Sequence, residues 1–202
     1  IFNIQRLDWI NGHYIRNMDI DQLTRLCLPY LLETGLIETA QENELSQASV
    51  CTEEKQTEMH FEKYKIKATN ELIDFECLSQ IVALEQERMK KLGEIGGMTE
   101  FFFKDKLDYE PELLIWKKST QEETKNNLKI LEEKLSALAK FDQKTLEDTL
   151  LPLTKEYGTG ELLWPLRACL SGRKASPGPF EIAAVLGKEK TLQRIQDAQT
   201  KL

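Results

Sequence analysis

The chain has 202 residues, of which 41% are hydrophobic and 30% charged, a composition typical of one large or two small globular domains. Its net charge of −7 counts against non-specific binding to nucleic acid, which depends on cations that neutralise phosphates. The apolar runs are too short to span a bilayer and the first residues lack a signal-peptide pattern, so we expect no membrane partner.

The cysteines and histidines do not form a metal-binding pattern. They are Cys27, Cys51, Cys77 and Cys169 with His13 and His60. No CxxC pair occurs and no spacing suits a metal, so we predict no metal site and no redox motif. In a chain without a secretion signal we expect free thiols in a reducing cytosol, and therefore a cytoplasmic protein.

The first stretch, Ile1–Met18, repeats apolar residues at helical spacing. We expect Trp9, His13 and Tyr14 to pack in the core, with their polar ends hydrogen-bonded. The chain opens abruptly on this amphipathic pattern and does not begin with Met, which predicts a fragment of a longer protein.

Asp19 or Asp21 can cap a second helix that runs to about Glu33, and Pro29 should kink or split it. The polar stretch Glu38–Thr57 that follows predicts a long loop or a broken helix.

Thr69–Gly93 carries the strongest helical periodicity of the chain. The carboxylates Glu85 and Glu87 are interpreted as part of its solvated face rather than as an acid–base pair. Glycines at 93, 96 and 97 then predict the boundary between two helical subdomains, 1–97 and 98–202.

In the second half, Thr120 begins a Thr-x-x-Glu capping box, and Asp142 can cap a helix over Thr145–Tyr157 that Pro152 should bend. The helix that begins at Thr120 should bury one face, formed by the leucines at 128, 131, 135 and 138. Six prolines, ten glycines and no convincing series of alternating strands favour an all-α fold of two consecutive helical subdomains.

Gly160–Gly187 predicts a helix, a turn and a second helix. Leu163, Leu166 and Leu170 share one face, and Trp164 and Arg167 form a neighbouring stripe. Gly172 suits a left-handed helix end, and Pro179 suits the first turn of the next helix. An αα-hairpin with a solvated loop explains the pattern, but its Arg-Lys-Ala-Ser-Pro-Gly-Pro loop could also hold a phosphate or an unstacked base.

Charge is distributed unevenly between this end and the remainder of the chain. Residues 160–202 carry seven cations and four anions, a net charge of +3, which leaves −10 for the rest. An acidic body with a mildly basic end favours local contact with RNA without general adhesion.

The stretch over residues 160–190 resembles the C-terminal end of bacterial glutamyl-tRNA synthetases; it reads GELLWPLRACLSGRKASPGPFEIAAVLGKEK. Members of that family carry a helix with Pro-Leu-Arg, a turn with (Thr/Ser)-Pro-Gly, called the corner below, and a later Leu-Gly-(Lys/Arg)-Glu motif. Two further parts of the chain are similar to the same family: the string LDWINGHYIR, and the ordered segments FFF, YEPELLIWKK and LSAL. The resemblance therefore covers both halves of the chain. The resemblance implies the C-terminal anticodon-binding region of a class I enzyme, an α-helix cage, with tRNA-Glu as partner.

The resemblance also implies which residues contact RNA. The family uses its Pro-Leu-Arg arginine and its corner for the first two anticodon bases, and an Arg or Gln for the third. The implied anticodon-binding residues are Arg88, Arg167, Ser176, Pro177, Gly178 and Pro179, and possible tRNA-backbone contacts are Arg16, Arg173 and Lys174. Pro179 departs from the leucine that is frequent in the family.

No active-site motif occurs in the chain, and the family's ATP-binding signatures are absent. The resemblance therefore implies a glutamate–tRNA ligase fragment that is inactive alone, with no catalytic residue and no cofactor here, and with ATP and Mg²⁺ in a missing catalytic domain. We expect a monomer that does not bind DNA. The alternative is a non-catalytic helical protein-interaction module.

Overall fold

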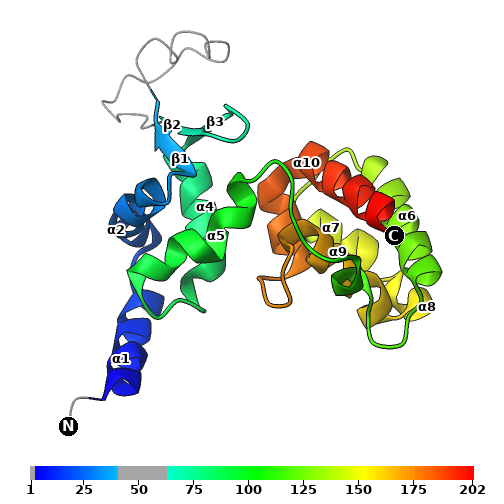
Figure 1. Ribbon diagram of the computed structural model, residues 1–202, viewed down its shortest axis with the longest axis horizontal. Helices are drawn as coiled ribbons and strands as arrows, with labels where there is room; N and C mark the ends of the chain where they lie inside the picture. Colours follow the sequence, from blue (N-terminus) through cyan, green and yellow to red (C-terminus); the bar gives the residue numbers. More distant parts are fainter. Residues whose placement is uncertain (1–2, 41–62) are drawn as a thin grey trace. The chain divides into compact units, whose positions relative to one another are not determined.

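The computed structural model describes residues 3–40 and 63–202 and divides the chain into two compact units, Ile1–Asp105 and Lys106–Leu202 (Figure 1). The predicted all-α class is confirmed in that the described residues are mostly helical, but the first unit also contains one small sheet that was not predicted. The predicted loop at Glu38–Thr57 lies mostly in residues 41–62, outside the described residues.

The first unit begins with two helices, α1 (Ile4–Arg16) and α2 (Ile20–Glu33). Asp19 caps α2 as predicted, because its side chain accepts from the backbone N–H groups of residues 21 and 22. The helix is not split at Pro29.

The buried face of α2 consists of Leu23, Thr24, Cys27 and Leu31. In α1, by contrast, the prediction that Trp9 and Tyr14 pack in the core is wrong, because each is 67% exposed. Helical periodicity alone does not show which apolar stripe finds a partner, and His13 is exposed as well.

A three-stranded antiparallel sheet follows, in the order β1 (Ile37–Thr39), β2 (Lys63–Ile66) and β3 (Leu72–Asp74). Its buried side chains are Ile37, Tyr64 and Ile66. Asn70 adopts a left-handed conformation, with φ of 61°, in the turn between β2 and β3.

The sheet corrects the predicted helix over Thr69–Gly93. The helix α4 spans only Phe75–Gln86, and Asp74 caps it by accepting from the N–H of Cys77 at 2.8 Å. Pairing with β2 holds the preceding residues extended, so tertiary contact overrides local helical periodicity there.

A 3₁₀ turn, η1 (Leu92–Glu94), and the helix α5 (Ile95–Phe103) complete the first unit. The predicted break at Gly96 and Gly97 is wrong, because both residues lie inside α5. This helix packs on α2 and α4 and buries Phe101–Phe103, so the first unit extends to Asp105 rather than ending at Gly97.

The second unit is a bundle of helices. Its elements are η2 (Pro111–Leu114), α6 (Gln121–Ser136), α7 (Gln143–Leu150), α8 (Thr154–Tyr157), α9 (Thr159–Ser171) and α10 (Pro179–Lys201). Helix α10 packs on α6, α7 and α9, and α6 packs on α9 (Figure 1). Leu128, Leu131 and Leu135 of α6 are fully buried, as the leucine repeat predicts, whereas Leu138 lies beyond the end of the helix and is only half-buried.

Local signals for helix ends in this unit are confirmed. Thr120 and Glu123 form the predicted capping box, and Asp142 accepts from the N–H of Thr145 at 2.8 Å. The helix expected over Thr145–Tyr157 is divided instead into α7 and α8 around Pro152.

The cap at Asp142 makes a prediction about acid titration. Hydrogen bonding to Lys140, and then to Thr145, lowers the pKa of Asp142 from 3.8 to about 2. Because the folded pKa is below the unfolded one, the stabilisation is complete above about pH 4 and is lost between about pH 4 and pH 2. NMR titration should give a midpoint near pH 2 that rises in Lys140→Ala. A midpoint near 3.8 in the unmodified chain would contradict the contact with Lys140 first, and the cap to Thr145 with it.

Candidate nucleic-acid interface

The stripe formed by Trp164 and Arg167 lies on α9 beside its buried face. The guanidinium carbon of Arg167 is 4.8 Å from the centroid of the Trp164 ring, a cation–π distance. The buried leucines are Leu162, Leu166 and Leu170, whereas the predicted Leu163 is only half-buried.

Trp164 is itself held in place by two contacts with the segment before α6. Its indole N–H donates to the carbonyl of Leu113 at 2.8 Å, and its ring lies 4.9 Å from that of Trp116. Sequence reasoning missed Trp116, because its partner is far away along the chain. The Trp164 ring, on which Arg167 stacks, is therefore fixed by contacts within the chain itself.

The loop after α9 turns sharply at Gly172. This residue has φ of 66°, and its N–H donates to the carbonyl of Ala168 at 2.8 Å, which confirms the predicted left-handed end. Arg167 Nη2 donates to the carbonyl of Lys174 at 3.2 Å, so the arginine ties the loop back to the helix.

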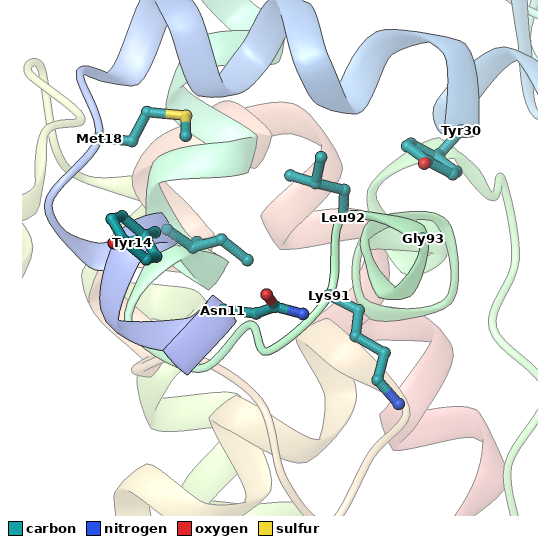
Figure 2. A pocket seen from close by; sticks show the side chains of 8 residues that line it. Asn11, Tyr14, Met18, Tyr30, Lys91, Leu92 and Gly93 are labelled. Atoms are coloured by element: carbon teal, nitrogen blue, oxygen red, sulfur yellow. The ribbon is translucent and has the colours of Figure 1, made fainter. Parts of the chain in front are cut away.

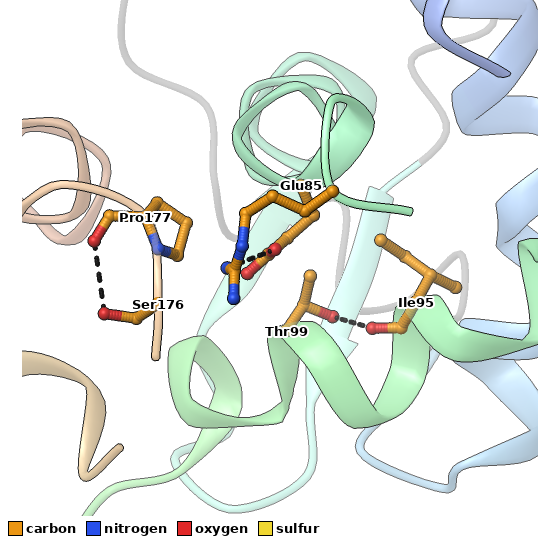
Figure 3. A network of polar contacts seen from close by, with 6 residues as sticks. Glu85, Ile95, Thr99, Ser176 and Pro177 are labelled. Carbon is orange, nitrogen blue, oxygen red and sulfur yellow. Dashed lines mark hydrogen bonds and ion pairs between the residues drawn. The ribbon is translucent and has the colours of Figure 1, made fainter. Parts of the chain in front are cut away.

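Ser176–Pro179 forms the predicted corner at the start of α10. Pro177 is buried, so the solvent-accessible surface of the corner belongs to Ser176, Gly178 and Pro179. The Ser176 hydroxyl donates to the carbonyl of Pro177 at 3.1 Å (Figure 3). Pro179 occupies the first turn of α10, as expected.

Gly178 caps α10 and permits a close approach. A Cβ at this position would lie 2.2 Å from Oε2 of Glu181, which bends back over the helix start. This buried carboxylate oxygen has no hydrogen-bond partner among the described residues. An acidic side chain in the first turn of a helix stabilises that helix. Gly178 leaves room for the Glu181 carboxylate there, so we interpret Gly178 as a residue that shapes the corner.

The loop offers its cations in different settings. Lys174 is exposed, Arg173 is half-buried, and the Arg173 N–H donates to the Ser171 hydroxyl at 3.3 Å. On the buried face of α9, burial raises the pKa of the Cys169 thiol to about 12, although the nearby Arg194 opposes the shift. The thiol therefore stays neutral and serves as a packing group.

Arg88 lies in the first unit, just beyond the end of α4. Its Nη1 is 2.6 Å from Oε2 of Glu85, whose side chain is 1% exposed (Figure 3). The interpretation of Glu85 as part of a solvated face is therefore wrong, because the rotation of α4 turns it inward while Glu87 stays exposed. The side chain of Arg88 is 37% exposed.

The predicted backbone contact Arg16 is the last residue of α1 and is half-buried. A pocket with a volume of about 320 Å³ opens in the first unit between α1, α2 and η1 (Figure 2). Its lining residues are Asn11, Tyr14, Ile15, Met18, Tyr30, Lys91, Leu92 and Gly93. The pocket offers one cation, Lys91, which pairs with Asp8 at 3.2 Å.

Residues 3–40 and 63–202 lack two further features. No group of three or more His, Cys, Asp or Glu side chains there is arranged to hold a metal ion. No helix in the same residues combines the length and apolar character that crossing a membrane requires.

Comparison with known proteins identifies the architecture. Residues 22–199 match the family model of the anticodon binding domain. Similar proteins include a glutamate–tRNA ligase of Caldanaerobacter subterraneus subsp. tengcongensis, 34% identical over 98% of this chain and 35% of its own length. A glutamate–tRNA ligase of Dehalococcoides mccartyi is 31% identical over 100% of this chain and 36% of its own length.

The fold is also shared with solved structures. A crystal structure of a glutamate tRNA ligase from Elizabethkingia meningosepticum aligns with a TM-score of 0.68 and 20% identity, over 98% of this chain and 32% of that one. The chain thus spans about a third of the length of the relatives that it matches.

Proposed function

Because the chain belongs to the anticodon binding domain family, we propose that it recognises the anticodon of tRNA-Glu as part of a glutamate–tRNA ligase. The observation that supports this role most directly is the preorganised Arg167, which stacks on Trp164 beside the Ser-Pro-Gly corner. The proposal assigns ATP, Mg²⁺ and glutamate attachment to the part of such a ligase that this chain does not span. It also assumes a cytoplasmic monomer.

Arg167 and the corner Ser176–Pro179 are assigned to the first two anticodon bases. Nη2 of Arg167 donates to Lys174 O, which leaves the other guanidinium donors available to a base edge. Arg173 and Lys174 are assigned to the tRNA backbone, because a cation on a loop can follow a phosphate without recognising sequence. Arg16 receives the same role in the first unit.

Arg88 is assigned to the third anticodon base, which is C in tRNA-Glu and G in tRNA-Gln. Guanidinium offers only donors. The pairing edge of cytosine presents two acceptors, O2 and N3, beside one N–H donor, whereas that of guanine presents two N–H donors beside one acceptor, O6. An arginine aimed at this edge is satisfied by C and opposed by G, which favours an enzyme that charges tRNA-Glu and refuses tRNA-Gln.

The function is tested by a gel shift with the 202-residue chain at low and moderate salt. We expect tRNA-Glu to bind more tightly than tRNA-Gln and unrelated tRNAs, and the preference to follow the anticodon when it is exchanged between transcripts. A low net affinity is expected, since the net charge of −7 opposes contact with phosphates. Equal binding of all tRNAs at both salt concentrations would support a helical protein-interaction module instead.

A further inference from the structure

Glu85 is a charged side chain in an unusual position. It is 1% exposed, yet it belongs to the last turn of α4, immediately before the segment that presents Arg88. Its Oε2 accepts from Arg88 Nη1 at 2.6 Å, a short charge-assisted bond (Figure 3). A buried carboxylate is costly unless it is paired, so this contact is firmly held.

The backbone around Arg88 is also fixed. Met89 is fully buried, and the amide of Gln86 donates to the carbonyls of Ile15 and Met18 at 2.9 Å each. The N–H of Arg88 donates to the carbonyl of Glu85 at 3.0 Å. The remaining freedom of Arg88 lies in its side chain, and the ion pair with Glu85 restricts that side chain.

We propose that Glu85 is a positioning residue that sets specificity at the third anticodon base by holding Arg88. The inference rests on the proposed role of Arg88. Glu85 accepts the hydrogen bond from Arg88 Nη1. The other donors of the guanidinium are thereby held in one orientation, in which they face the base. The charge of Glu85 also offsets the charge of Arg88, which reduces the attraction of the site for any phosphate and leaves the hydrogen-bond pattern to decide between C and G.

The pairing affects the choice of variants. Arg88→Gln alone would leave the buried Glu85 carboxylate without its guanidinium, so a loss of binding could arise from a local rearrangement. Glu85→Gln preserves the shape and an accepting oxygen but removes the charge, whereas Glu85→Leu removes both. Glu87→Gln is the matched control. It removes the same negative charge one residue before Arg88, but from a side chain that is exposed.

The experiment measures dissociation constants of the full chain for tRNA-Glu transcripts with C or G as the third anticodon base, at two salt concentrations. Glu85→Leu should lower the preference for C by at least about fivefold, chiefly by tighter binding of the G transcript. It should also steepen the dependence of log affinity on log salt by about one unit, as a released cation gains a phosphate. Glu85→Gln should lie between, and Glu87→Gln should match the unmodified chain.

A preference for C that survives Glu85→Leu in a folded protein would overturn the inference, as would an equal loss in Glu87→Gln. If Glu85→Leu does not fold, Glu85→Gln decides by the same two measurements. If Glu85→Leu/Arg88→Leu loses the preference while Glu85→Leu keeps it, Arg88 retains its proposed role and only the role of Glu85 is wrong. An unmodified chain with no preference for C would instead overturn the proposed role of Arg88, and with it this inference.

Discussion

Arg194→Met is expected to destabilise the second unit by about 1.5–3 kcal/mol, as removal of a charged donor from a buried acceptor does. Arg194 is 3% exposed and lies on α10, from which Nη1 donates to the carbonyl of Leu170. Leu170 belongs to the last turn of α9, where carbonyls have no partner within the helix. Methionine fills similar volume but leaves this buried carbonyl without its donor.

Urea denaturation followed by tryptophan fluorescence measures this effect. Trp116 and Trp164 are packed together in the second unit, whereas Trp9 is 67% exposed, so the change in signal reports mainly on the second unit. The matched control is Lys188→Met. Lys188, also on α10, donates to the carbonyls of Ser136 and Leu138 at 2.7 Å, but at a site that water can reach. Equal losses in the two variants would show that burial of the Leu170 carbonyl is not the cause.

The parts of the fold that could be predicted from sequence depend on contacts a few residues apart. Thr120, Asp142 and Gly172 end or begin helices through bonds to residues at most four positions away. The all-α class follows from composition in the same way. These features were predictable because the chain supplies both partners locally.

The features that sequence reasoning missed depend on distant partners. The strand β2 alternates Lys and apolar residues over Lys63–Ile66, a weak period-two signal whose partners lie on two other strands. In α1, Tyr14 belongs to an apolar repeat at helical spacing and Trp9 lies beside it, yet both side chains are exposed. The periodicity of apolar residues predicts which face of a helix or strand is apolar, but only the tertiary structure shows whether another element covers that face.

The candidate site was partly predictable for the same reason. Trp164 and Arg167 lie three residues apart on a helix, so their contact follows from helical geometry. The support from Trp116 and the buried Glu85 beneath Arg88 did not follow. Glu85 and Glu87 have the same chemistry, and only the packing of α4 makes one buried and the other exposed.

Arg167→Ala is expected to weaken binding of tRNA-Glu by about 1–3 kcal/mol, the range for a charge-assisted bond to a base. The reason is preorganisation. Stacking on Trp164 at 4.8 Å and the bond to Lys174 O at 3.2 Å hold the guanidinium before RNA arrives, so little side-chain entropy is lost on binding. Truncation also releases the 173–178 loop from α9.

Titration of labelled tRNA-Glu with each variant measures the loss. Lys144→Ala is the control for charge, because Lys144 is exposed on α7 of the same unit, and its affinity should change by less than about 0.5 kcal/mol. Trp164→Phe keeps a ring beneath Arg167 but loses the N–H bond to Leu113 O, so we expect an intermediate loss. The loss in Arg167→Ala should persist at moderate salt, since a contact with a base is less screened than one with phosphate. An unchanged affinity in folded Arg167→Ala would make Arg167 an ordinary surface cation that ties a loop to its helix.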